Sequence, residues 1–90
     1  MSLTVCIPVH HRHELLYNSL SSQIAAYSKG FDVQLMKHSN RGEHTIGEIR
    51  QMMLEQVTTP YVTFIDADDR IHQNYFKWVF KGIEAGAKGI

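Results

Sequence analysis

The chain has 90 residues, enough for one small domain built around a single hydrophobic core. Hydrophobic residues make up 43% of it and charged residues 20%, as in an ordinary globular domain. Nine basic side chains balance nine acidic ones, so the charge does not indicate a nucleic-acid-binding surface. No apolar run approaches the roughly 20 residues of a transmembrane helix, and the N-terminus lacks a signal-peptide pattern. We therefore expect a cytoplasmic protein without a transmembrane segment, in which Cys6 is a reduced, buried thiol.

The first half of the chain predicts a strand, a helix and a second strand. Residues 3–9 form an apolar run, and Pro8 near its end predicts that strand pairing stops there. Residues 12–29 carry apolar side chains at helical spacing, and Gly30 follows as a left-handed C-cap. Residues 31–37 alternate loosely between apolar and polar side chains, which predicts a less buried edge strand.

The second half predicts a helix, a strand and a third helix. Thr45 and Glu48 have capping-box spacing before an apolar periodicity, which predicts a helix over residues 46–57. Residues 61–65 are β-branched and aromatic, and this strand should end at Asp66. A third amphipathic helix follows, with His72 near its start.

Alternation of strands and helices predicts a three-layer α/β/α fold with a short parallel sheet. The more polar second strand belongs outside, which gives the strand order 2-1-3. Ligands of open α/β sheets bind beyond the carboxyl ends of strands where the chain reverses direction across the sheet. The residues expected there are Pro8, Val9, His10 and His11 after the first strand, and residues 66–69 after the third.

Three carboxylates lie within four residues at this predicted site, on Asp66, Asp68 and Asp69. In an extended segment, side chains at i and i+2 point to the same side about 6.5 Å apart, so Asp66 and Asp68 could converge on one cation. Oxygen ligands suit Mg²⁺ or Mn²⁺, and such a site usually includes substrate phosphates. The alternative is that an Asp-rich loop only solvates the strand end and caps the next helix.

Histidine and arginine side chains offer further ligands. His10, His11 and His13 cluster after the first strand and could bind a transition metal together with the carboxylates, or simply contact a ligand or water. Arg50 could bind phosphate through its planar guanidinium group, or could simply be a surface or salt-bridging residue of its helix.

Two segments resemble the inverting family-two glycosyltransferases. Residues 7–12 (Ile-Pro-Val-His-His-Arg) look like the opening strand and loop of that family. Residues 46–51 (Ile-Gly-Glu-Ile-Arg-Gln), followed by residues 66–69 (Asp-Ala-Asp-Asp), resemble its second signature and its metal-binding Asp-x-Asp motif. The resemblance covers nearly the whole chain and corresponds to the N-terminal, nucleotide-binding half of such an enzyme.

This resemblance implies an A-type glycosyltransferase fold, a Mn²⁺ or Mg²⁺ ion and a nucleotide-sugar donor, usually a uridine diphosphate sugar. It places Pro8 and Val9 at the nucleoside, Arg50 near the base or phosphates, and Asp66, Asp68 and Asp69 at the metal. The chain departs from the family at His10-His11, where Tyr-Asn is usual. It departs again at residues 37–40 (Lys-His-Ser-Asn), where Asp-Asp-Gly-Ser is usual.

Two functions follow from these observations. One is a glycosyltransferase that binds its donor through the metal and transfers the sugar to an unknown acceptor. The other is a non-catalytic nucleotide-sugar or nucleotide-diphosphate binding module, because the 90 residues would form one domain lacking the acceptor-binding half and its general base. We also expect self-association, since a three-stranded sheet has two open edges and the third helix is too aromatic to bury all its rings.

Overall fold

Strands and helices alternate along the chain in the predicted order. The computed structural model describes residues 2–86. A 3₁₀ turn, η1 (His11–His13), separates the first strand from the first helix. The regular elements are β1 (Leu3–His10), α1 (Glu14–Tyr27), β2 (Val33–Asn40), α2 (Ile46–Gln56), β3 (Tyr61–Phe64) and α3 (Tyr75–Glu84).

The three strands form one parallel sheet in the order β2-β1-β3, which confirms the predicted arrangement. β1 pairs with β2 over eight residues, from Leu3 opposite Val33 to His10 opposite Asn40. It pairs with β3 over only four, and that register ends at Cys6 opposite Phe64. Almost all of β1 is buried, because it lies at the centre of the sheet with helices on both faces. β2 is the more exposed edge strand, as its polar sequence predicted.

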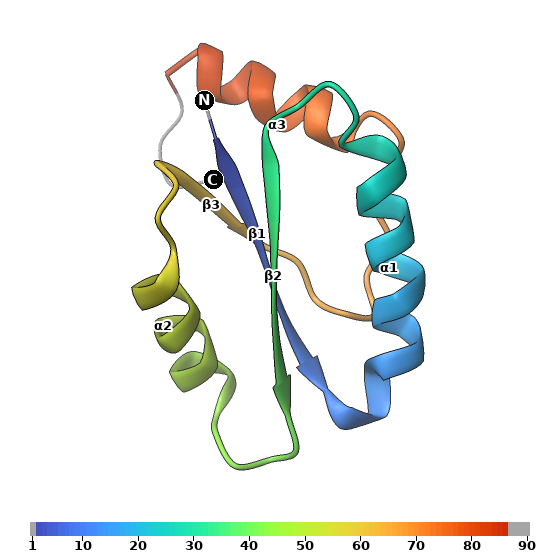
Figure 1. Cartoon of the computed structure of the whole chain (residues 1–90), viewed down its shortest axis with the longest axis vertical. Coiled ribbons are helices and arrows are strands. Elements are labelled where there is room, and N and C mark those ends of the chain that lie inside the picture. Colours follow the sequence, from blue (N-terminus) through green and yellow to red (C-terminus); the bar gives the residue numbers. More distant parts are fainter. Residues whose placement is uncertain (1, 87–90) are drawn as a thin grey trace.

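Helices cover both faces of the sheet and complete a three-layer architecture (Figure 1). Alternate side chains of β1 point to opposite faces. Leu3, Val5, Ile7 and Val9 pack with α1 and α3, whereas Cys6 packs with Ile49 and Met53 of α2. Between residues 2 and 86, no helix is both long enough and apolar enough to span a membrane.

Pro8 does not end strand pairing in the way the sequence predicted. Pairing with β2 continues through Pro8 to His10, whereas pairing with β3 stops at Cys6. The Cys6 carbonyl accepts a hydrogen bond from the Ile65 N–H at 3.1 Å, on the β3 side. Because residues two apart direct their backbone groups to the same side, the missing N–H of Pro8 also faces that side. Pro8 therefore removes no hydrogen bond to β2.

The second strand lies later in the sequence than predicted. β2 covers Val33–Asn40 rather than residues 31–37. Phe31 lies before the strand because its ring packs on Phe80, with ring centroids 5.0 Å apart. Gly30 has the predicted left-handed backbone, with φ of 85°, but it belongs to a turn beyond the helix. The Phe31 N–H closes this turn on the Ser28 carbonyl.

Two boundaries near the C-terminal half also differ from the prediction. β3 ends at Phe64, so Asp66 lies in the following loop and not at the end of the strand. α3 begins at Tyr75, and His72 lies before it. The His72 ring stacks on Trp78 with centroids 4.9 Å apart. Trp78 is 55% exposed while Phe76 and Phe80 are buried, which confirms that α3 cannot bury all of its aromatic rings.

Candidate functional site

The loop after β3 is anchored by two apolar residues and exposes three acidic ones. Ile65 and Ala67 are buried in the core shared with α1 and α3. The intervening and following residues Asp66, Asp68 and Asp69 are exposed. A turn closed by the Asp69 N–H on the Asp66 carbonyl, at 3.0 Å, bends the loop. Burial of the apolar pair therefore fixes the loop while the carboxylates remain in water.

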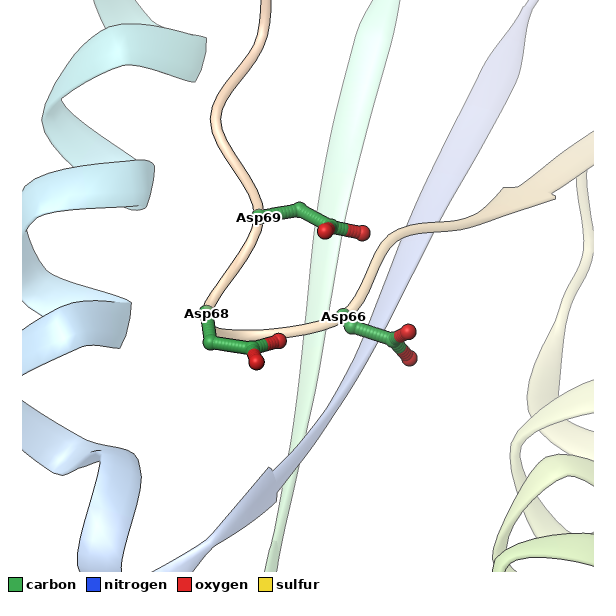
Figure 2. A group of neighbouring side chains, drawn as sticks. All are labelled: Asp66, Asp68 and Asp69. Atoms are coloured by element: carbon green, nitrogen blue, oxygen red, sulfur yellow. The ribbon is translucent and has the colours of Figure 1, made fainter.

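All three carboxylates lie close to one another. One oxygen from each of Asp66, Asp68 and Asp69 lies within 4.8 Å of the others. Figure 2 shows Asp68 and Asp69 pointing toward the Asp66 part of the loop, with the Asp66 carboxylate directed away from them. The sequence predicted convergence of Asp66 and Asp68 from an extended backbone, but the backbone here is a turn, which also brings in Asp69. Three exposed oxygen ligands suit a hard cation whose remaining positions are filled by water or phosphate.

A cavity of about 330 Å³ opens beside this cluster, at the carboxyl ends of β1 and β2. It contains the predicted β1 residues Pro8, Val9 and His10 together with Asp66 and Asp68. Its volume falls at the lower end of the roughly 300–1,000 Å³ of small-molecule sites. The strand order therefore brings residues more than 50 positions apart in the sequence to one cavity, where the chain reverses across the sheet.

Arg50 lies next to the acidic cluster rather than in the cavity wall. Its Nη2 atom is 4.0 Å from Oδ1 of Asp66, and its guanidinium carbon is 5.7 Å from the centre of the Phe64 ring. Both charged side chains are about half exposed. Arg50 thus forms the salt bridge that the sequence left as an alternative, and it does so with a predicted metal ligand.

Histidines line one side of the cavity but do not join the carboxylates. Among the described residues, the carboxylate trio is the only cluster of three potential metal ligands, so a mixed histidine and carboxylate metal site is not formed. His10 and His11 rings lie 4.2 Å apart. Partial desolvation, followed by the neighbouring charge of His11, lowers the pKa of His10. His10 is therefore mainly neutral near pH 7.

The tautomer of His10 is determined by a local hydrogen bond. Its Nδ1 atom accepts the Arg12 backbone N–H at 3.2 Å. A neutral ring whose Nδ1 is an acceptor carries its proton on Nε2. His10 can therefore donate a hydrogen bond to a ligand oxygen without bringing a full positive charge to the cavity.

The sequence missed three residues of the cavity wall, namely Asn40, Ile46 and Ile49, whereas His13, which it offered as a possible ligand, does line the cavity. Asn40 is buried, and its side chain holds the following loop by accepting the Gly42 N–H at 3.2 Å and donating to the His44 carbonyl at 3.1 Å. Gly42 adopts a left-handed backbone with φ of 96°, which glycine tolerates without strain. A predicted strand that ended at Asn40 instead of residue 37 would have placed Asn40 at the carboxyl end of the sheet, where the ligand site was expected.

Helix α2 brings its apolar N-terminal turn to the cavity through its capping box. The Thr45 hydroxyl accepts the Glu48 N–H at 3.2 Å, and the Glu48 carboxylate accepts the Thr45 N–H at 3.0 Å. The backbone hydrogen bond from Thr45 is the main reason that the pKa of Glu48 is lowered. The predicted cap is confirmed, and it fixes Ile46 and Ile49 beside the β1 end.

Comparisons of the chain with protein-family models, with curated proteins and with solved structures find no match.

Proposed function

We propose that this chain binds a nucleotide-diphosphate sugar, with uridine diphosphate as the expected nucleotide, through Mn²⁺ or Mg²⁺ held by Asp66 and Asp68. The observation that carries the proposal is the grouping of three carboxylates, two of which, Asp66 and Asp68, line a cavity at the carboxyl ends of β1 and β2. A bound divalent ion would offset the diphosphate charge, and Asp69 would complete the acidic cluster. Similarity of residues 46–51 and 66–69 to glycosyltransferase signatures supports the same ligand class.

The cavity is chemically divided in a way that suits such a ligand. Pro8, Val9, Ile46 and Ile49 give the cavity an apolar wall, and the exposed Asp66 and Asp68 give it an acidic one. A planar base would pack against the apolar wall, and the diphosphate would reach the ion at the acidic wall. His10 would donate from Nε2 to a ligand oxygen between them.

Thermal unfolding tests the proposal. A ligand that binds only the folded state raises stability by RT ln(1 + [L]/Kd), so saturating Mn²⁺ with uridine diphosphate should raise the melting temperature. Asp66→Asn and Asp68→Asn should each remove most of this rise and leave the fold intact, while Glu84→Gln, which removes an exposed carboxylate on α3, should retain it. An unchanged melting temperature for the wild-type chain would exclude the proposed site.

Arg50 provides a second, independent test because it faces Asp66. Its guanidinium offsets part of the Asp66 carboxylate charge, and a bound cation would release it to bind phosphate. Arg50→Gln should therefore tighten binding of Mn²⁺ alone, measured by electron paramagnetic resonance, and weaken binding of the diphosphate in the presence of Mn²⁺. Weaker binding of both would show that Arg50 supports the fold of the loop instead.

Glycosyl transfer and simple binding are separated by turnover. Incubation with a panel of nucleotide sugars and Mn²⁺ should release nucleoside diphosphate if the chain transfers the sugar to water in place of its acceptor, and should leave the donors intact if it is a binding module. Asp68→Asn is the control, because loss of release in that variant assigns turnover to this cavity and not to a contaminating enzyme.

A further inference from the structure

The outer edge of β2 carries a row of backbone groups directed away from the sheet. The Leu3 N–H donates to the Asp32 carbonyl at 3.0 Å, so even-numbered residues of this segment direct their backbone groups toward β1. Because these directions alternate along a strand, Val33, Leu35, Lys37 and Ser39 direct their N–H and C=O groups outward. No other segment within residues 2–86 hydrogen-bonds to these outward groups.

β2 also lacks the features that usually protect a sheet edge. Its eight residues pair with β1 in one unbroken register and contain neither proline nor glycine. Its one lysine, Lys37, does not guard the edge, because the ammonium group binds Glu14 at 2.7 Å and lies over the Tyr17 ring on the α1 face. Leu35, in the middle of the strand, is 42% exposed. The edge is therefore long, regular and partly apolar.

The other edge of the sheet is much less suited to pairing. The Ile65 N–H donates to Cys6, so odd-numbered residues near β3 face β1. Within the four residues of β3, only Val62 and Phe64 then direct their backbone groups outward. Pro60, immediately before the strand, has no N–H to extend the edge. A partner strand would find four outward-facing residues on β2 and two on β3.

We infer that the β2 edge is a dimer interface, which a second copy of this chain occupies in antiparallel orientation. Placing Leu35 on the two-fold axis sets Val33 opposite Lys37 of the partner subunit. The three resulting pairs, with two hydrogen bonds in each, give about six backbone hydrogen bonds and a continuous six-stranded sheet. This register buries the exposed Leu35 side chain against the partner's Leu35.

A second copy fits this edge better than an unrelated strand, because the pairing is self-complementary. The same residues serve both subunits, so the contact closes after two chains. Pairing of β2 with the β3 edge of another copy would leave free edges at both ends and would continue into a filament. A strand-edge contact is small compared with stable interfaces, which bury about 1,200–2,000 Å². The dimer should therefore be weak and depend on concentration.

Sedimentation velocity over a concentration series from low to high micromolar tests this inference. The wild-type chain should shift from a mass near 10.3 kDa toward twice that value. Leu35→Lys places two ammonium groups directly opposite each other at the axis, and this variant should remain a monomer across the series. Leu54→Lys is the matched control, because Leu54 is 41% exposed on α2, and it should dimerise like the wild type.

Outcomes that overturn the inference are equally clear. If the wild-type chain stays monomeric at every concentration, it has no interface of this kind. If Leu35→Lys dimerises as well as the wild type, the interface lies elsewhere, for example on the Trp78 side of α3. Circular dichroism should show that both variants are folded, since each residue is exposed at the surface. Larger species in place of a dimer would indicate pairing of β2 with β3.

Oxidative cross-linking tests the register itself. In a Cys6→Ala background, Leu35→Cys should form an intersubunit disulfide, because directly opposite residues in a hydrogen-bonded pair have Cα atoms about 5.5 Å apart. Met36→Cys is the control, since its partner copy lies diagonally at about 7–8 Å, beyond the usual disulfide range. Cross-linking of Met36→Cys in preference to Leu35→Cys would exclude the proposed axis.

Discussion

The hydrophobic clusters on the two faces of the sheet differ in size, although the central strand β1 contributes side chains to both. Among residues 2–86, eleven buried residues form the hydrophobic core on the α1 and α3 face, whereas the buried hydrophobic cluster on the α2 face consists of Cys6, Ile49 and Met53. Two helices cover the first face and one short helix covers the second (Figure 1). The candidate cavity opens at the carboxyl end of the thinner face, where Ile49 belongs both to the small core and to the cavity wall.

This difference suggests a division of labour between stability and binding. Buried apolar area is the main stabilising contribution to a small domain, so most of the free energy of folding should come from the α1 and α3 face. A single helix leaves space beside the strand ends, and the cavity occupies part of that space. Mutations that shift the balance between the two faces should therefore separate their contributions.

Truncation of buried side chains should show the largest contrast. Phe76 is fully buried on α3. Phe76→Ala should reduce the free energy of unfolding by about 3–5 kcal/mol, because the mutation leaves a cavity in the larger core. Met53→Ala should cost about 2 kcal/mol, since the partly exposed side chains around it can relax into the space. Urea denaturation gives both values, and the milder Phe76→Leu keeps the comparison measurable if Phe76→Ala does not fold. An equal or greater loss for Met53→Ala would contradict the proposed difference between the faces.

Removal of the α2 cap should have an intermediate effect confined to the thinner face. Thr45→Ala deletes the hydroxyl that accepts the Glu48 N–H and should reduce the free energy of unfolding by about 1 kcal/mol. Thr58→Ala, an exposed threonine just after α2, is the control and should change little. Native-state hydrogen exchange should show faster exchange at the start of α2 and not in α1. Equal changes in both helices would mean that the faces unfold as one unit.

Acid should destabilise both faces by a smaller amount through two glutamates. The hydrogen bond from Lys37 chiefly lowers the pKa of Glu14, as the Thr45 backbone lowers the pKa of Glu48. A folded-state pKa below the unfolded value gives stability that is complete above the ordinary glutamate pKa of about 4.3 and is lost as pH falls through the lowered value. Glu14→Gln and Glu48→Gln should each flatten this acid limb of the free energy of unfolding, measured in urea.

Added salt should distinguish the two glutamates. The Glu14–Lys37 ion pair is partly exposed and screened by salt. Glu48 is held mainly by a short-range hydrogen bond to the Thr45 backbone, which salt affects less. High salt should therefore reduce the contribution of Glu14 to the free energy of unfolding more than that of Glu48. A larger reduction for Glu48 would show that these contacts are not the source of the stabilisation.

Much of the fold was predictable because local patterns and tertiary packing agree. The apolar run of residues 3–9 predicted a strand, and the spacing of Thr45 and Glu48 identified the start of α2. Strand polarity gave the order 2-1-3, since an edge strand needs fewer apolar side chains. That order predicted that Pro8, Val9 and His10 meet Asp66 and Asp68, which they do at the cavity, whereas His11 and Asp69, predicted at the same place, do not line it.

Tertiary structure alone decided the details that determine the site's chemistry. Phe31 packs on Phe80 before β2 begins, and pairing with β1 extends the strand to Asn40, whose side chain holds the next loop. Burial of Ile65 and Ala67 imposed the turn that brings Asp69 to Asp66. Arg50 forms its salt bridge with Asp66 only because the tertiary structure brings α2 close to the end of β3. Local sequence specifies which segments are helices or strands, but contacts between distant segments set where each one ends, because the burial that decides a boundary comes from partners far away in the chain.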